Sequence, residues 1–411
     1  MAYDLTEKQK EKYILVAVET PEAPEADESL RELRELVKTA GGEAVYEVVQ
    51  KLPHFDTATY IGKGKAQELI PVMEGLGATG VVCDDELSPA QIRNLSDLLD
   101  AKVIDRTILI LDIFAAHAST NEGKIQVEMA QQKYRLSHLS GMGKVLSRLG
   151  GGIGTRGPGE TKLETDRRQI SARISTLRRN IKEMEQVRET MRKQRMGNAT
   201  PIIAIVGYTN AGKSTLLNHL TGASVLEEDK LFATLDPTTR ECRLPGGQKV
   251  LLTDTVGFID KLPHHLIDAF RSTLEEAKYA DVILHVVDGA DPHRERHMEV
   301  VYETLHELKI TGKPVITVFN KCDLYPEEEL FRDAKADQVI RVSAKKEIRL
   351  TQLCELMEKV LRESKTEIRT VIPYGEMAYL DQIHRYGQIL SEEYVQDGVE
   401  IHAYVPSSLV R

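Results

Sequence analysis

The segment from Gly207 to Ser214 has the residue types and the spacing that bind phosphate. Its sequence, Gly-Tyr-Thr-Asn-Ala-Gly-Lys-Ser, matches the pattern G-x-x-x-x-G-K-[ST] and lies between an apolar run and a helix-forming one. The glycines allow a tight turn whose N–H groups converge on phosphate oxygens, and the helix start adds a favourable dipole. Lys213 adds a positive charge at the β- and γ-phosphates. We therefore predict a nucleotide phosphate loop rather than a chance glycine-rich turn.

A second motif, Asn320-Lys321-Cys322-Asp323, concerns the choice of base and follows the apolar run 315–319. Guanine presents an N1–H and an exocyclic amine on one edge, and a single carboxylate, Asp323, can accept from both. Adenine has no such donor pair, so the acceptor would stay unpaired. Asn320 is expected to tie this loop to the phosphate loop, and the Lys321 stem to pack on the base. Ser-Ala-Lys at 343–345 is expected to form a second wall.

A third motif, Asp254-Thr255-Val256-Gly257, follows the apolar run 250–252. Asp254 is placed to hold Mg²⁺ through water, and the Gly257 N–H to meet a γ-phosphate oxygen. Thr234 lies between the phosphate loop and Asp254, where a nucleotide-sensing segment must lie, and is the candidate second hydroxyl on Mg²⁺. The alternative for Thr234 is an ordinary loop threonine, because Thr238 and Thr239 are close by.

These motifs define the candidate site. Mg²⁺ is the expected cofactor, with Ser214 and Thr234 as its protein ligands, and GTP the expected substrate. Lys213, Thr234 and Gly257 are the candidate catalytic residues. The residues expected to contact the nucleotide are Gly207, Tyr208, Thr209, Asn210, Ala211, Gly212, Lys213, Ser214, Phe232, Ala233, Thr234, Leu235, Asp236, Asp254, Thr255, Val256, Gly257, Asn320, Lys321, Cys322, Asp323, Ser343, Ala344 and Lys345.

The residue after Gly257 is unusual for such a site. Many nucleotide hydrolases of this class place a water-orienting glutamine there, whereas this chain has Phe258, which neither donates nor accepts a hydrogen bond. We therefore expect slow intrinsic hydrolysis and a need for a partner, or another group, to position water. His264 and His265 are possible substitutes, but ordinary polar residues at a helix start are the better interpretation.

The chain must also build the elements that position these motifs. The first 115 residues alternate β-branched runs with amphipathic helical patterns: strands are expected at 14–18, 44–49, 79–82 and 103–104, with helices between them. This order is typical of a mostly parallel sheet. Gly62-x-Gly64-Lys65 is too short for a phosphate loop and is interpreted as a turn into a helix.

A different pattern begins near residue 120. A helix is expected from 122 to 139, then a glycine-rich basic stretch at 147–168, then a long helix with apolar residues at heptad spacing. The seam residues are Leu163, Ile170, Ile174, Leu177, Ile181, Met184, Val187 and Met191. An antiparallel helical hairpin is the economical interpretation, and an intermolecular coil stays open. We expect a monomer.

Charge is unevenly distributed along the chain. Residues 133–198 carry 16 Lys and Arg against 6 Asp and Glu, whereas the rest of the chain carries 38 against 58. A basic segment on an acidic protein can meet nucleic-acid phosphate locally. A solvated helical face is the alternative; the glycines at 150–159 favour close approach of backbone to RNA, and the lack of aromatic residues there favours contacts to shape and phosphate.

We predict four domains within an α/β fold. A βαβ-type N-terminal domain (1–118) precedes a basic helical hairpin with a Gly-rich loop (119–198), a P-loop GTPase domain (199–365) and a small α+β C-terminal domain (366–411). In the last, a strand at 368–372 and a helix at 376–386 precede two strands that are joined through Asp397-Gly398, a hairpin signal.

Composition limits the class of protein and its location in the cell. With 41% hydrophobic and 29% charged residues, the chain has the composition of a soluble globular protein. No apolar run approaches membrane-spanning length, and the N-terminus lacks the pattern of a secretory signal. The four cysteines are scattered, which argues against a zinc site or disulfide framework and suits a reducing compartment. A cytoplasmic location is expected, with peripheral membrane association as an alternative.

The sequence resembles a specific family. The nucleotide motifs together with Phe258 resemble the Obg/HflX branch of the translation-factor-related GTPases. The run from Gly157 to Arg168 (Gly-Pro-Gly-Glu-Thr-Lys-Leu-Glu-Thr-Asp-Arg-Arg) looks like the signature of the HflX family, as do the runs 232–237, 254–262 and 60–65. The resemblance covers essentially the whole chain and is more specific than a phosphate loop alone.

The resemblance implies a GTPase that binds the 50S ribosomal subunit and its rRNA and helps to dissociate stalled or hibernating ribosomes into subunits. It also implies that the large subunit stimulates hydrolysis, and that the hairpin with its Gly-rich loop approaches the peptidyl-transferase region. Two alternatives stay open. One is a GTPase that checks large-subunit assembly, and the other is an RNA- or protein-binding scaffold in which hydrolysis is incidental.

Overall fold

The computed structural model describes residues 10–139, 158–195, 200–222, 231–232, 237–261, 276–326, 329–363, 366–405 and 409–410. The chain forms two compact units. The first consists of residues 1–181 with 261–269, and the second of 182–260 with 270–411. The four domain boundaries expected from the sequence stay a prediction.

The first unit contains a four-stranded parallel sheet in the order β2-β1-β3-β4. Its strands are β1 (Lys12–Glu19), β2 (Glu43–Lys51), β3 (Gly80–Cys83) and β4 (Lys102–Asp105), and its connecting helices are α1 (Ala26–Thr39), α2 (Lys63–Leu76) and α3 (Pro89–Leu99). Every strand expected in this region is present, and Gly62 precedes α2 as the expected turn.

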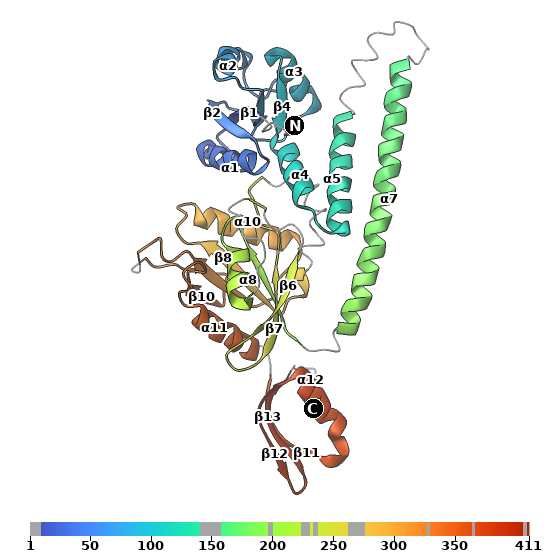
Figure 1. The fold of residues 1–411 in the computed structure, drawn as a ribbon, viewed down its shortest axis with the longest axis vertical. Helices are drawn as coiled ribbons and strands as arrows, with labels where there is room; N and C mark the ends of the chain where they lie inside the picture. The colour runs from blue at the N-terminus through green and yellow to red at the C-terminus, as the bar shows by residue number, and fades with distance from the viewer. Residues whose placement is uncertain are drawn as a thin grey trace, which may run out of the picture. The chain divides into compact units, whose positions relative to one another are not determined.

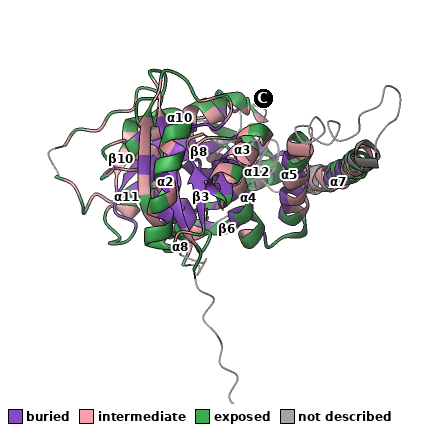
Figure 2. Ribbon diagram, turned by 90° about the horizontal axis from the view of Figure 1, so that it is seen from above, coloured by how far each residue is buried: buried purple, intermediate pink, exposed green. Residues whose placement is uncertain are grey.

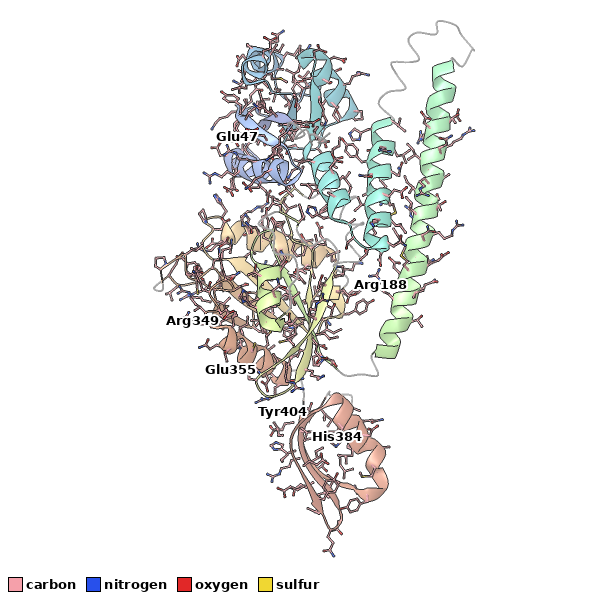
Figure 3. The ribbon with its side chains drawn as sticks, in the orientation of Figure 1. Glu47, Arg188, Arg349, Glu355, His384 and Tyr404 are labelled. Carbon is pink, nitrogen blue, oxygen red and sulfur yellow. The ribbon has the colours of Figure 1, made fainter. Side chains whose placement is uncertain are left out.

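Local chemistry explains where these elements begin and which face they bury. Helix α1 places Leu30, Leu33 and Leu36 on one face, and all three are almost fully buried. Ser88 begins α3 with a capping box, in which its side chain and that of Gln91 each bond the other's backbone N–H. On the edge of the sheet, Arg34 of α1 donates a 2.7 Å hydrogen bond to Glu47 of β2 (Figure 3).

Three further helices follow, α4 (Arg106–His117), α5 (Asn121–Leu139) and α7 (Pro158–Arg195). Helices α5 and α7 lie side by side (Figure 1), with Ile174, Leu177 and Ile181 buried against Met129. Arg173 adds a two-point ion pair to Glu128 of α5. The intramolecular hairpin interpretation is therefore confirmed for this part of the seam, whereas Val187 is 55% exposed.

The glycine-rich stretch is shorter than expected. The sequence pattern placed it at 147–168, but α7 begins at Pro158, so its second half is helical. The reason is compositional, because glycine ends at Gly159 and good helix formers follow, while proline at the first helical position has the required φ. Residues 140–157 lie outside the described residues.

The second unit contains a six-stranded sheet in the order β10-β9-β8-β5-β7-β6, parallel except for β6. Its elements are β5 (Ile202–Gly207), α8 (Lys213–Thr221), β6 (Thr238–Arg243), β7 (Lys249–Asp254), β8 (Val282–Asp288), α10 (Arg294–Glu307), β9 (Val315–Asn320), β10 (Gln338–Arg341) and α11 (Leu350–Glu363). The central strands are almost entirely buried; Figure 2 shows this for β8, as it does for β3 of the first unit.

The C-terminal part of the second unit is an antiparallel three-stranded sheet, β11-β13-β12, covered by one helix. Its elements are β11 (Thr366–Pro373), the 3-10 turn η2 (Tyr374–Glu376), α12 (Met377–Tyr386), β12 (Gln388–Val395) and β13 (Gly398–Val405). The expected hairpin at Asp397-Gly398 joins the last two strands. His384 of α12 lies 3.1 Å from Glu392 of β12 (Figure 3).

Among the described residues, none of the helices combines the length and the apolar character that crossing a membrane requires.

Candidate functional site

The predicted phosphate loop connects β5 to α8, as the motif requires. Two of its glycines are required for two reasons: neighbouring atoms leave no room for a side chain, and the backbone has a positive φ. A Cβ on Gly207 would lie 2.2 Å from the Val286 carbonyl oxygen, and one on Gly212 would lie 2.3 Å from Nδ2 of Asn320. Both residues also have positive φ, at 157° and 92°. A side chain at either position would displace the loop.

Lys213 and Ser214 begin α8 and point into the loop. Lys213 Nζ donates a 2.9 Å hydrogen bond to the Tyr208 carbonyl oxygen, and the Ser214 hydroxyl donates at 2.7 Å to the Asp254 carboxylate. Burial lowers the pKa of Lys213 to about 8, partly offset by the negative charge of Asp254. A phosphate beside this ammonium would stabilise its charged form. The Lys213 ammonium can therefore bind an anion, and the oxygen atoms of Ser214 and Asp254 beside it can bind a cation.

The D-x-x-G segment leaves β7 and runs against the phosphate loop. The Phe258 N–H donates to the Gly207 carbonyl (3.1 Å), and the Thr209 N–H donates to the Phe258 carbonyl (2.7 Å). A Cβ on Gly257 would lie about 3.0 Å from Lys213 Nζ and from Thr209 Cα, so glycine is required here by space. Thr255 is fully buried and bonds the Ile205 carbonyl. Phe258 is 2% exposed, so its side chain belongs to the core.

The base-side motif lies at the end of β9. Asn320 Nδ2 donates to the Ala211 carbonyl and its Oδ1 accepts from the Ala344 N–H, both at 2.9 Å. Its side chain therefore joins the phosphate loop to the Ser-Ala-Lys loop, which is the contact expected from the sequence. Asp323 is exposed, with its carboxylate accessible to a base. The N–H of Cys322 bonds the Val342 carbonyl (2.9 Å) and fixes the loop.

The Ser-Ala-Lys loop follows β10. Ser343 exchanges two backbone hydrogen bonds with Ile348, and its hydroxyl accepts from the Lys346 N–H. Ala344 is buried beneath Asn320, whereas Lys345 is exposed. The structure therefore brings all three base-side segments together around one side chain, Asn320. The roles of these residues in nucleotide binding stay a prediction.

Part of the predicted site is outside the described residues. Ala233, Thr234, Leu235 and Asp236 fall there, as do His264 and His265. Phe232 is described and is buried, with a φ of 57°. The role proposed for Thr234 therefore stays a prediction.

Sequence reasoning missed one residue of the site, and one contact of a residue that it had named. Asp288, the last residue of β8, pairs with Lys321 at 2.6 Å and so holds the stem that is expected to cover the base. The signal was available, because a carboxylate that ends a buried strand beside a ligand loop lies at the carboxyl edge of the sheet. The second is the Tyr208 hydroxyl, which accepts from the Asp260 N–H at 2.8 Å, and no sequence pattern indicated this contact.

The donor set fits a hard divalent cation. The Ser214 hydroxyl and the Asp254 carboxylate are oxygen ligands that meet at the start of a helix, beside the lysine that would hold the nucleotide phosphates. Mg²⁺ is bound in this way, by one or two protein oxygens together with substrate phosphates.

The parallel sheet, the phosphate loop and the base-side loops define a P-loop GTPase. Three family profiles match the chain: "GTP-binding GTPase N-terminal" at residues 27–115, "GTP-binding GTPase Middle Region" at 117–195 and "50S ribosome-binding GTPase" at 202–321. The GTPase HflX of Lacrimispora saccharolytica is 57% identical over 400 residues, covering 97% of this chain and 95% of the relative. The chain belongs to the HflX family of GTPases, which confirms the resemblance.

Other relatives agree. The GTPase HflX of Caldanaerobacter subterraneus is 48% identical over 97% of this chain and 92% of its own length, and that of Escherichia coli is 45% identical over 72% and 69%. Among solved structures, a GTP-binding protein from the archaeon Sulfolobus solfataricus in complex with GDP is 25% identical over 86% of this chain and 99% of its own, with a TM-score of 0.45.

Proposed function

We propose that this GTPase binds the ribosomal large subunit through its helical hairpin and uses its GTP-bound state to separate stalled or hibernating ribosomes into subunits. One observation carries the proposal. Helix α7 carries exposed basic side chains away from the seam residues that pack on α5, among them Arg178, Arg179 and Lys182, and Arg167 is exposed nearer its N-terminal end. Such side chains suit phosphate contacts to RNA, which give affinity without reading sequence.

The features of the nucleotide site favour a GTPase whose hydrolysis is regulated by a partner. Lys213 and the phosphate-loop N–H groups bind and orient the phosphates, and the Gly257 N–H is placed to detect the terminal one. Ser214 and Thr234 would hold Mg²⁺, with Asp254 acting through water, and the ion would supply charge neutralisation when bound. Because the Phe258 side chain is buried, it does not orient water. We therefore propose that a group on the large subunit completes the site.

The direct test is sedimentation of intact ribosomes in the presence of the protein with GTP or with a non-hydrolysable analogue. The proposal expects conversion of whole ribosomes to subunits in both cases. Unchanged profiles in both would contradict ribosome splitting. Preferential binding to immature large subunits without splitting would instead identify an assembly factor, the second function considered.

Two double variants with the same change in charge test whether the basic side chains of α7 bind the large subunit. Arg178→Glu with Arg179→Glu should weaken binding to large subunits about tenfold or more and reduce its salt dependence, because two phosphate contacts are lost. Arg240→Glu with Arg243→Glu, two exposed arginines on β6, is the control with the same change in charge. Equal losses in the two pairs would show that net charge alone, and not the hairpin, governs binding. GTP hydrolysis with and without purified large subunits checks the proposed stimulation.

A further inference from the structure

Tyr208, the second residue of the phosphate loop, contacts two other parts of the nucleotide site. Its backbone carbonyl accepts a 2.9 Å hydrogen bond from Nζ of Lys213, the lysine expected to bind the β- and γ-phosphates. Its hydroxyl accepts a 2.8 Å hydrogen bond from the N–H of Asp260, which follows Gly257 closely in the chain. One residue therefore joins the phosphate-binding lysine to the chain that follows the D-x-x-G glycine.

Helix α10 fixes the ring that carries this hydroxyl. Tyr208 is 8% exposed, and its ring stacks on that of His297, with centroids 3.9 Å apart and an interplanar angle of 12°. Nδ1 of His297 lies in turn 3.7 Å from the carboxylate of Asp291. A buried and stacked ring has little freedom to rotate. The position of the hydroxyl, and with it the place where the Asp260 N–H is bound, is therefore set by α10.

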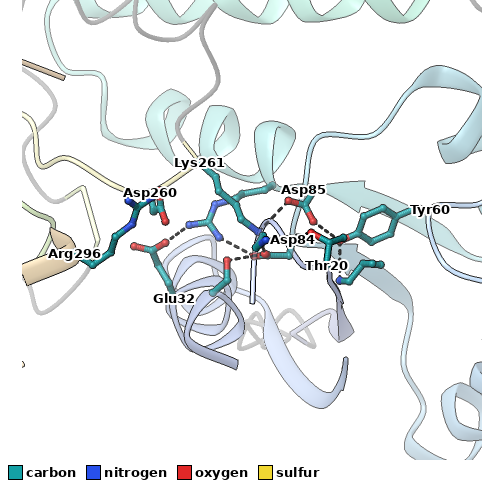
Figure 4. Close-up of polar contacts among 12 residues, drawn as sticks. Thr20, Glu32, Tyr60, Asp84, Asp85, Asp260, Lys261 and Arg296 are labelled. Carbon is teal, nitrogen blue, oxygen red and sulfur yellow. Dashed lines mark hydrogen bonds and ion pairs between the residues drawn. The ribbon is translucent and has the colours of Figure 1, made fainter. Parts of the chain in front are cut away.

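The neighbouring residue of α10 contacts Asp260 as well. Arg296 lies 3.5 Å from the Asp260 carboxylate (Figure 4). The side chain of Arg296 is 45% exposed, so this ion pair contributes little by itself. It nevertheless places the Asp260 carboxylate beside the helix that also holds the Tyr208 ring. The hydrogen bond from the Asp260 N–H to the Tyr208 hydroxyl is therefore the stronger of the two contacts that hold Asp260.

The D-x-x-G glycine lies where it can contact a γ-phosphate. A Cβ on Gly257 would lie 3.0 Å from Lys213 Nζ, so the backbone at Gly257 is close to the ammonium that would bind the phosphates. The next residue, Phe258, exchanges backbone hydrogen bonds with Gly207 and Thr209 of the phosphate loop. These bonds fix the segment just after the glycine, and the Tyr208 hydroxyl fixes it further along the chain.

We infer that Tyr208 is a positioning residue for recognition of the γ-phosphate: its hydroxyl holds Asp260, so that the Gly257 N–H stays within reach of a γ-phosphate beside Lys213. GDP has no γ-phosphate and does not use this N–H. The hydroxyl therefore raises the affinity for GTP and leaves the affinity for GDP unchanged. The inference rests on the role proposed for Gly257 and is independent of the ribosomal role.

Tyr208→Phe tests the inference, because it removes the hydroxyl and keeps the ring that stacks on His297. Binding is measured with the full chain, Mg²⁺ and fluorescent forms of GDP and of a non-hydrolysable GTP analogue. The affinity for the analogue should fall about fivefold, the loss expected for one hydrogen bond, whereas the affinity for GDP should change by less than about twofold. Tyr325→Phe is the matched control: its hydroxyl bonds the Phe319 carbonyl in the same unit, and its removal should leave the ratio of the two affinities unchanged.

Variants of His297 test whether stacking positions the hydroxyl. His297→Ala removes the ring that stacks on Tyr208 and should lower the affinity for the GTP analogue, relative to GDP, as Tyr208→Phe does. His297→Phe keeps an aromatic ring and should stay within about twofold of the parent chain. The double variant of Tyr208→Phe with His297→Ala should lose no more than the weaker-binding single variant, because both changes act through the same hydrogen bond.

Gly257→Ala distinguishes failure of this inference from failure of the proposed nucleotide site. Its Cβ would crowd Lys213 Nζ, so it should lower the affinity ratio more than Tyr208→Phe does. An effect of Gly257→Ala with none of Tyr208→Phe would overturn the inference alone, and no effect of either would overturn the γ-phosphate role of Gly257 as well. With melting curves that show folded protein, equal losses for both nucleotides in Tyr208→Phe would also overturn it. So would additive losses in the double variant, or a His297→Phe chain that binds as weakly as His297→Ala.

Discussion

The Ser214 hydroxyl donates a 2.7 Å hydrogen bond directly to the carboxylate of Asp254, forty residues further along the chain. Ser214 is the second residue of α8 and Asp254 ends β7, so the contact joins the two motifs that hold Mg²⁺ in this class. Ser214 would hold Mg²⁺ directly and Asp254 would hold it through water, so both oxygen atoms belong to the proposed metal site. The contact therefore marks the place where Mg²⁺ would bind together with the nucleotide.

Replacement of Ser214 should make the protein insensitive to Mg²⁺. In Ser214→Ala, GTP affinity with Mg²⁺ is expected to fall about 10- to 100-fold, because an oxygen ligand is lost. With EDTA present, the parent and the variant should bind GTP alike. Thr221→Ala, at the far end of the same helix, is the control. Equal affinities with Mg²⁺ would contradict the role of the serine.

Asp323 should set the choice of base. In Asp323→Asn the carboxylate that accepts from the guanine edge becomes an amide, and GTP affinity should fall about 100-fold or more. Xanthosine triphosphate, which presents a carbonyl where guanine has an amine, should gain affinity. Competition binding of the two nucleotides measures both changes. A variant that keeps its preference for GTP would show that Asp323 does not read the base.

Introduction of the missing glutamine should not create a faster enzyme. Phe258 is 2% exposed, so Phe258→Gln places an amide in the core instead of beside the nucleotide. The free energy of unfolding should fall by about 3 to 5 kcal/mol, and hydrolysis by the free protein should not rise. Phe258→Leu, which stays apolar, should lose less stability. A tenfold rise in hydrolysis by Phe258→Gln would show that this side chain reaches the attacking water.

His285 should make the protein less stable in acid. It is 1% exposed on β8. Burial lowers its pKa from the ordinary value of 6.5 to about 4, opposed by the charge of Asp333 and aided by that of Lys213. Between these pH values the imidazole binds a proton in the unfolded chain but stays neutral in the folded chain. The free energy of unfolding should therefore fall as pH drops from 6.5 towards 4, by about 3 kcal/mol in total.

His285→Leu isolates this contribution. Urea unfolding at several pH values should show a shallower acid dependence for the variant than for the parent chain, because the carboxylates common to both cancel in the comparison. Removal of the imidazole also removes a buried Nδ1 atom that has no hydrogen-bond partner within the described part of the chain. Identical pH slopes for the two proteins would mean that His285 is protonated in the folded state.

The elements that position the nucleotide were predictable because their signals are local. Strands β5, β7 and β9 are apolar runs that each end at a motif, and the contact of Asn320 with the phosphate loop follows from the way such strands align. Strand β6 was not expected. Among its six residues Cys242 alone is buried, so its sequence Thr-Thr-Arg-Glu-Cys-Arg carries almost no apolar pattern.

The contacts that were missed depend on tertiary packing. The hydrogen bond from Asp260 to the Tyr208 hydroxyl joins residues 52 positions apart, and the Lys261–Asp84 pair joins residues 177 apart. In sequence, Asp260 and Lys261 are an unremarkable pair of surface charges. Their meaning depends on which helices and strands lie beside them, and periodicity does not contain that information.

The long helix α7 has a mechanical consequence. It continues from its buried residue Ile174 to Pro158, sixteen residues away, which is about 24 Å of rigid rod at 1.5 Å per residue. A tilt of about ten degrees where it packs on α5 would sweep its N-terminal end through about 4 Å. The helix is therefore a lever, which converts a small repacking of a few apolar side chains into a displacement as large as the spacing between neighbouring bases.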